Sequence, residues 1–323
     1  WPWRTYRSAW FGFTRSHATR LACESGEGMD GLVQFAQQVV SGTAIGCVYA
    51  LVALGFVLIY KATEVVNFAQ GELMMVGAFL AYTFIVILGM GFWLGALLAL
   101  LGTALLGGAL DRVVMRPMVG QPVFAIIMVT IGIGFMFRSI VAMTPGWGVD
   151  TYTIGTPFYG KVVSLGDLVL SQDHLAIIVL TVLLVAALFA FFRYTRLGVA
   201  MQATSQNQLA AYYMGIPVKT VFSMIWALSA AVAAFAGILL APIAFVHVNM
   251  GFLGIKAFPA AVLGGFGSIP GAIVGGLIIG VVEALAGFYL PEGFKDVAAY
   301  VVLLAVLIVR PQGLFGEIAR KKV

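Results

Sequence analysis

Residues 39–60 read Val39-Val-Ser-Gly-Thr-Ala-Ile-Gly-Cys-Val-Tyr-Ala-Leu-Val-Ala-Leu-Gly-Phe-Val-Leu-Ile-Tyr60, and this stretch decides the fold class. It contains no charged side chain, and Lys61 follows it directly. About 20 apolar residues in a helix cross the roughly 30 Å hydrocarbon layer of a bilayer. We therefore predict that residues 39–60 form a membrane-spanning helix.

The composition of the whole chain agrees with this prediction. Of its 323 residues, 62% are hydrophobic and 10% are charged, whereas soluble domains have about 45–50% apolar and about 25% charged residues. The mean hydropathy is +1.04. These values exclude a soluble enzyme, a disordered chain and a nucleic-acid-binding module. The net charge of +5 is better explained by the basic residues that membrane proteins collect on their cytoplasmic side.

Apolar runs of similar length recur along the chain, separated by polar segments. They lie at about 73–88, 92–110, 123–143, 174–192, 221–246, 271–290 and 294–309, and a shorter run lies at 255–266. The shorter run cannot cross the hydrocarbon layer alone. We predict an all-α, polytopic membrane helical bundle of about eight transmembrane helices plus one short or re-entrant segment. Turn residues in the loop 144–172 and alternating hydrophobicity around residues 152–163 also indicate a small hairpin.

Basic residues predict the orientation, because cytoplasmic segments are enriched in Lys and Arg. If residues 193–219 are cytoplasmic and 255–266 counts as a crossing, ten basic residues lie inside and four lie on or near the outside. The inner set is Lys61, Arg112, Arg116, Arg193, Arg196, Lys219, Arg310, Arg320, Lys321 and Lys322. This distribution predicts that the loop 144–172 is extracytoplasmic and that residues 198–215 are cytoplasmic.

Residues 1–28 differ from the rest of the chain. They carry Arg4, Arg7, Arg15 and Arg20 and no apolar run of spanning length. They also lack the apolar core of a signal peptide. We predict that residues 1–28 are a non-native or disordered extension, and that residues 29–323 form one transmembrane domain.

The segment 196–217 is polar and lies between two predicted spans. Gly198 near its start and Gly215 with Pro217 at its end predict one short helix at the cytoplasmic surface. Small and polar side chains would give this helix a compact surface that fits a groove on another protein. The residues concerned are Ala203, Asn207, Ala210, Ala211 and Gly215. The alternative is an ordinary solvated connector.

Four polar side chains lie within or beside the apolar runs, where they are costly and often functional. They are Asn67, Glu72, Lys256 and Glu283. One interpretation is that some of them line a polar path or a gate; the other is structural pairing that fixes the register of the helices. Because Lys256 and Glu283 are both predicted at outward depth, an ion pair between them is possible.

Several glycines follow residue 266, most of them four residues apart. They are Gly267, Gly271, Gly275, Gly276 and Gly280. Small residues on one stripe let helix backbones approach closely, either inside the chain or at a seam between subunits. No G-x-x-x-x-G-K-[ST] motif is present, and the three histidines lack metal-ligand spacing. The sequence therefore predicts no catalytic residue, no metal site and no cofactor.

Several longer motifs occur in a fixed order along the chain. They are Tyr49-Ala-Leu-Val-Ala-Leu-Gly55 with Val66-Asn-Phe-Ala-Gln-Gly-Glu72, Arg193-Tyr-Thr-Arg-Leu-Gly198 with Asn207-Gln-Leu-Ala-Ala211, Lys256-Ala-Phe-Pro-Ala260 leading to Gly267-Ser-Ile-Pro-Gly271, and Arg310-Pro-Gln-Gly-Leu314. With these motifs, the chain resembles permease subunits of ATP-binding-cassette importers of the branched-chain amino acid (LivH) type. The resemblance extends from Met29 to the C-terminus.

This resemblance implies a multi-pass protein of the bacterial inner membrane that is not itself an enzyme. Residues 198–215 would be the coupling helix that docks on a cytoplasmic ATPase. The implied partners are two ATPase subunits, a second homologous permease, a periplasmic binding protein and membrane lipid, with no nucleic acid. One alternative is a permease of a urea or short-chain amide importer. Alternatives of another class are a stand-alone secondary transporter or channel and, more remotely, an intramembrane enzyme.

Overall fold

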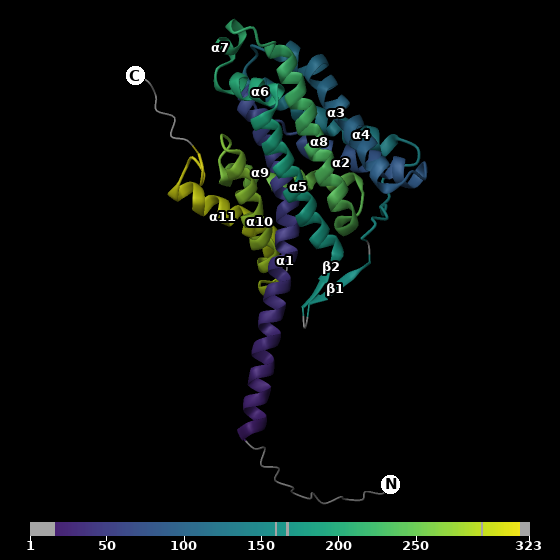
Figure 1. Ribbon diagram of the computed structural model, residues 1–323, viewed down its shortest axis with the longest axis vertical. Helices are drawn as coiled ribbons and strands as arrows, with labels where there is room; N and C mark the ends of the chain where they lie inside the picture. Colours follow the sequence, from purple (N-terminus) through teal and green to yellow (C-terminus); the bar gives the residue numbers. More distant parts are fainter. Residues whose placement is uncertain (1–16, 159, 166–167, 292, 317–323) are drawn as a thin grey trace, which may run out of the picture.

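The computed structural model describes residues 17–158, 160–165, 168–291 and 293–316, and over them the chain is almost entirely helical (Figure 1). The α-helices are α1 (His17–Thr63), α2 (Gln70–Tyr82), α3 (Phe92–Leu110), α4 (Val123–Met143), α5 (Gln172–Tyr194), α6 (Arg196–Gln206), α7 (Gln208–Tyr213), α8 (Val218–Ala244), α9 (Phe252–Gly264), α10 (Ile269–Tyr289) and α11 (Phe294–Val309). Short π- or 3-10 segments follow α2, α3 and α8: η1 (Thr83–Ile87), η2 (Asp111–Met115), η3 (Arg116–Met118) and η4 (Val248–Gly251).

Helix α1 forms the centre of the bundle. Its segment from Ala44 to Ile59 is almost wholly buried, and α1 packs most extensively on α10 and then on α8. A helix that is apolar on every side must be surrounded by other helices or by lipid. The burial shows that other helices of the chain surround this segment of α1.

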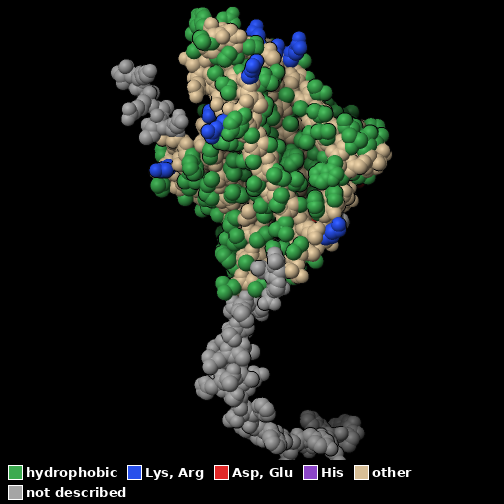
Figure 2. All heavy atoms as spheres, in the orientation of Figure 1, with side chains coloured by type: hydrophobic (Ala, Val, Ile, Leu, Met, Phe, Trp, Pro, Cys, Tyr) green, Lys and Arg blue, Asp and Glu red, His purple; other side chains and the backbone are tan. Residues whose placement is uncertain are grey.

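The outer helices expose their apolar side chains instead. Leu97, Leu101 and Leu105 of α3 and Val182 and Phe189 of α5 are all more than half exposed. Figure 2 shows hydrophobic atoms over the middle of the molecule, with most visible Lys and Arg towards the α6–α7 end. Such an apolar band is the surface that a bilayer covers.

Within the described residues, seven helical segments are long and apolar enough to cross a membrane, and they correspond to seven of the eight predicted runs. The eighth, α11, keeps its predicted bounds but has only 16 residues. The short run at 255–266 lies in α9 and the turn directly after it, and α9 forms one short apolar segment with η4, Val248–Gly264. The prediction for residues 1–28 lies partly outside the described residues: α1 begins at His17, and residues 1–16 are not described.

The directions of the helices show that η4 and α9 return the chain across the bundle. A side chain at Gly276 of α10 would meet Ala50, and one at Gly280 would meet Gly46, so α10 runs antiparallel to α1. Helix α8 is also antiparallel to α1. Ser229 Oγ donates a hydrogen bond to the Gly55 carbonyl of α1, whereas Ile225, which comes earlier in α8, lines a small cavity with Lys61, which comes later in α1. Helices α8 and α10 therefore run parallel to each other, so the chain must cross the bundle between them, as the predicted orientation requires.

The loop between α4 and α5 carries the predicted hairpin, although later in the chain than the alternation suggested. Strands β1 (Val162–Leu165) and β2 (Leu168–Ser171) pair antiparallel, and Tyr152 forms an isolated bridge with Val246. The hairpin lies at the end of the molecule opposite to α6 and α7 (Figure 1). The two segments predicted on opposite sides of the membrane are therefore at opposite ends of the bundle.

Candidate functional sites

The polar segment between α5 and α8 forms two helices rather than the one predicted. The Thr195 hydroxyl accepts a hydrogen bond from the Gly198 amide at 3.0 Å and caps α6. Asn207 has an extended backbone, and its side-chain oxygen accepts from the Ala210 amide at 2.9 Å. Asn207 therefore ends α6 and begins α7, because Asn is a favoured N-cap that leaves the helical conformation.

The surface predicted for this segment is partly wrong. Ala211 is only 4% exposed and faces the rest of the chain, so it is not a contact residue on the free surface. Asn207 and Ala210 are exposed, and Ala203 is half-buried. Gly215 has φ = +81° and ends α7, a conformation that favours glycine.

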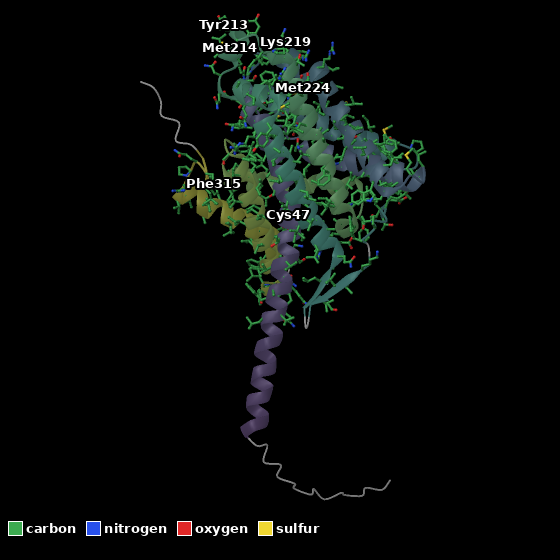
Figure 3. All side chains as sticks on the ribbon, viewed as in Figure 1. Cys47, Tyr213, Met214, Lys219, Met224 and Phe315 are labelled. Carbon is green, nitrogen blue, oxygen red and sulfur yellow. The ribbon has the colours of Figure 1, made fainter. Side chains whose placement is uncertain are left out.

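The sequence interpretation missed the most prominent side chains of α7. Four large residues in α7 and at its C-terminal cap are 64–83% exposed: Leu209, Tyr212, Tyr213 and Met214. Figure 3 shows Tyr213 and Met214 at the extreme end of the molecule. The available signal was four large apolar or aromatic residues inside a polar segment, where water alone would surround them. An exposed apolar cluster of this kind is typical of a protein-binding surface.

Two sets of contacts hold this end of the molecule in place. The Gln208 side-chain amide donates to the Ala62 carbonyl at 2.9 Å, which fixes α7 to the end of α1. The Arg116 guanidinium donates to Ser223 Oγ at 2.7 Å and pairs with Asp111 at 3.3 Å, which ties η2 and η3 to α8. A cavity of about 850 Å³ lies between η3, α7 and the start of α8.

The predicted ion pair between Lys256 and Glu283 is present, with Nζ 3.3 Å from Oε1. Two further groups complete the cluster. The Tyr49 hydroxyl donates a hydrogen bond to Glu283 Oε2 at 2.7 Å, and Lys256 also pairs with Asp296. Glu283 is 3% exposed, whereas the Asp296 side chain is largely exposed. The cluster therefore connects α1, α9, α10 and α11.

Glu72 has a partner that the sequence did not indicate. Its carboxylate pairs with Arg138 of α4, and the Arg138 guanidinium lies 3.9 Å above the centre of the Phe252 ring. Gly251 lies so close that any side chain there would overlap the Glu72 carboxylate. Arg138 therefore joins α4 to α2 and to the start of α9.

Asn67 belongs to a third, separate cluster. It lies in the non-helical segment before α2, where its side-chain oxygen accepts from the Ala69 amide at 3.1 Å. Gln70 donates to the Ser229 carbonyl at 3.2 Å, and Ser229 Oγ donates to the Gly55 carbonyl at 2.9 Å. Irregular backbone at membrane depth needs such internal partners. The four predicted polar residues therefore do not form one site, and their contacts favour structural pairing.

The glycine run serves two interfaces inside the chain. Side chains at Gly271 and Gly275 would overlap the backbone of α9, and side chains at Gly276 and Gly280 would overlap the backbone of α1. Gly267 is different, because it lies in the turn before α10 and an added Cβ would meet nothing within 4 Å. Gly267 therefore packs against no helix among the described residues, and a role for it at a seam between subunits stays a prediction.

Comparisons with known proteins agree with this architecture. The family described as branched-chain amino acid transport system / permease component matches residues 38–309. The high-affinity branched-chain amino acid permease LivH of Salmonella typhimurium is 34% identical, with 90% of this chain and 98% of the relative covered. BraD of Pseudomonas aeruginosa is 33% identical, with 91% and 100% covered. The autoinducer 2 import permease LsrC of Escherichia coli is 31% identical over only 56% of this chain.

The family match covers most of the chain, and the two branched-chain amino acid permeases align along nearly their whole lengths. The part of the chain that the structure describes has seven helices capable of crossing a bilayer, so the chain is a multi-pass membrane protein. It belongs to the family of branched-chain amino acid transport system permease components.

Proposed function

We propose that this chain is the membrane-spanning permease subunit of an ATP-binding-cassette importer of the bacterial inner membrane, and that it carries leucine, isoleucine, valine or related amino acids. The relatives matched over their whole length are named as permeases for branched-chain amino acids. The match to a permease named for another substrate covers little more than half of the chain. These names favour branched-chain amino acids over urea or short-chain amides.

The observation that carries the proposal is the surface of α7. A short helix between two spans presents Leu209, Tyr212, Tyr213 and Met214 to the solvent at the end of the bundle that is rich in basic residues. A stand-alone transporter or channel has no need of such a surface. An importer that takes its energy from separate ATPase subunits needs one, because closure of the ATPases must be transmitted to the spans.

The proposed assembly contains two cytoplasmic ATPase subunits, a second homologous permease and a periplasmic binding protein. The ATPases dock on α7, while the exposed apolar faces of the outer helices contact lipid and the second permease. The chain itself performs no hydrolysis in this assembly. The buried clusters around Glu72 and Glu283 hold the helices in register rather than binding substrate.

A pair of matched double variants tests the docking role. Tyr213→Ala with Met214→Ala removes two exposed side chains of α7, and the expected result is at least a tenfold loss of ATPase recovered with the purified permease. The control is Tyr289→Ala with Met143→Ala, which removes the same side-chain types from exposed positions at the other ends of α10 and α4. Equal ATPase recovery for the two variants would contradict the assignment of α7.

Transport measurements test the substrate separately. The complex in vesicles, supplied with its binding protein and ATP, should accumulate labelled leucine in competition with isoleucine and valine. Accumulation of labelled urea in place of leucine would identify the amide importer instead. That result would leave the docking role of α7 intact, so the two parts of the proposal can fail independently.

A further inference from the structure

A long groove lies on one side of the bundle between α5 and α10. Both helices pack on α1 but make hardly any contact with each other, so α1 forms the floor of the groove. Its volume is about 890 Å³, which is within the range of about 300–1,000 Å³ typical of ligand-sized pockets. Neither the docking surface of α7 nor the three buried polar clusters use this groove.

The groove is apolar along most of its length. Ala50 and Leu54 line its floor, Val185 and Phe189 line the α5 wall, and Ile273 lines the α10 wall. Along α1 it extends from Cys47 to Lys61, which is about 21 Å at 1.5 Å per residue. One leaflet contributes about 15 Å to the hydrocarbon layer. The groove therefore has the length of a single leaflet with its headgroup region.

The cytoplasmic end of the groove is basic. Lys61 from α1 and Arg193 from α5 both line it there, with Gln202 of α6 beside them. Both basic side chains are exposed, and among the described residues neither forms an ion pair with an acidic side chain. Two unpaired cations at the end of an apolar groove match a negatively charged amphiphile in both charge and polarity.

We propose that this groove binds an anionic glycerophospholipid of the cytoplasmic leaflet. One acyl chain lies between α5 and α10 over α1, and the phosphate lies between Lys61 and Arg193. Basic pockets between transmembrane helices on the cytoplasmic side bind such headgroups, with about 1 kcal/mol for each Lys or Arg near the surface. Charge complementarity distinguishes this occupant from a zwitterionic lipid, which has the same tails and no net charge.

Photo-crosslinking from inside the groove identifies its occupant directly. The full chain, purified with the subunits that accompany it, carries p-benzoylphenylalanine in place of Val185 in vesicles of equal phosphatidylglycerol and phosphatidylcholine. Two basic residues predict a roughly thirty-fold excess of phosphatidylglycerol in the lipid adducts. The control is the same group in place of Leu105, which is 75% exposed on α3 and outside the groove, where the two lipids should be labelled about equally.

Charge variants test which residues hold the headgroup. Lys61→Gln with Arg193→Gln should reduce the excess at position 185 to near one. Arg196→Gln with Lys219→Gln removes the same charge from the same end of the molecule outside the groove and should retain the excess. The comparison of positions 185 and 105 in the unaltered chain stands even if a charge variant folds poorly. Equal labelling of both lipids at 185, or an adduct to a second protein subunit there, would overturn the proposal.

Discussion

At the scale of single residues, the buried charges are held by more partners than the sequence revealed. Glu283 is nearly inaccessible and receives bonds from both Lys256 and Tyr49, whereas Lys256 also has the exposed Asp296. A buried charge that loses its partner is much more costly than the same charge at a surface. The two members of the predicted pair are therefore not equivalent.

Removing the lysine should be more damaging than removing the glutamate. Lys256→Gln leaves the Glu283 carboxylate buried without a cation, which costs about 3–5 kcal/mol. Glu283→Gln leaves Lys256 its contact with Asp296, so a smaller loss of stability is expected. Adding Glu283→Gln to Lys256→Gln should restore part of the loss, as measured by thermal unfolding of the purified protein. Strictly additive losses would show that the two side chains do not interact.

An added methyl group should lower the stability at one glycine of this run and leave it unchanged at another. A Cβ at Gly280 would overlap the Gly46 backbone of α1, and backbone cannot move aside cheaply. Gly280→Ala should therefore lower the stability by about 1–3 kcal/mol, the usual cost of overpacking. Gly267→Ala is the matched control, since its Cβ meets nothing within 4 Å. A melting temperature unchanged in both variants would disprove the tight contact between α10 and α1.

At the scale of elements, the break between α6 and α7 decides which side of each helix is free. The extended backbone at Asn207 ends α6 and begins α7, and within α7 consecutive residues lie about 100° apart around the helix axis. Ala210 is exposed and Ala211 is buried. The sequence interpretation assigned Ala211 to the contact surface because it is small, and side-chain size does not show which side of a helix packs on the bundle.

Tryptophan at the two neighbouring alanines separates folding from docking. Ala211→Trp forces a large ring into a packed site and should destabilise the isolated permease by about 1–3 kcal/mol. Ala210→Trp adds the same ring to an exposed position, so the melting temperature should be retained while recovery of the ATPase falls. The checks are thermal unfolding of the permease alone and co-purification with its ATPases. Equal melting temperatures for the two variants would contradict the burial of Ala211.

At the scale of the whole molecule, the two polar ends of the bundle are distinct. The hairpin end carries Lys161, and the opposite end carries α6, α7 and most of the visible basic side chains (Figure 2). A membrane protein retains more Lys and Arg in its cytoplasmic segments. The hairpin is therefore expected in the periplasm and α7 in the cytoplasm.

Cysteine labelling in intact cells tests this orientation. Lys161→Cys and Gln206→Cys both place a thiol at an exposed position, one at each end. The background carries Cys23→Ser and keeps Cys47, which is buried. An impermeant thiol reagent should modify the cysteine at 161 and spare the one at 206 until the cells are permeabilised. The reverse pattern would invert the orientation and place α7 outside.

The sequence by itself determined where the membrane spans lie, which loop carries the small hairpin and where the polar segment with α7 lies. These features depend only on residues that are neighbours in the sequence, because about 20 consecutive apolar residues suffice to specify a crossing. The predicted bounds of α4 and α11, at 123–143 and 294–309, agree with the structure for this reason.

Only the tertiary structure decided how the helices face one another. The Arg138 partner of Glu72, the buried side of Ala211 and the division of the glycines between α9 and α1 all depend on the rotation of each helix about its axis. Lipid is as apolar as the helices, so hydrophobicity does not select that rotation. Close packing and polar contacts between helices select it, and these join residues far apart in the chain, such as Tyr49 and Glu283.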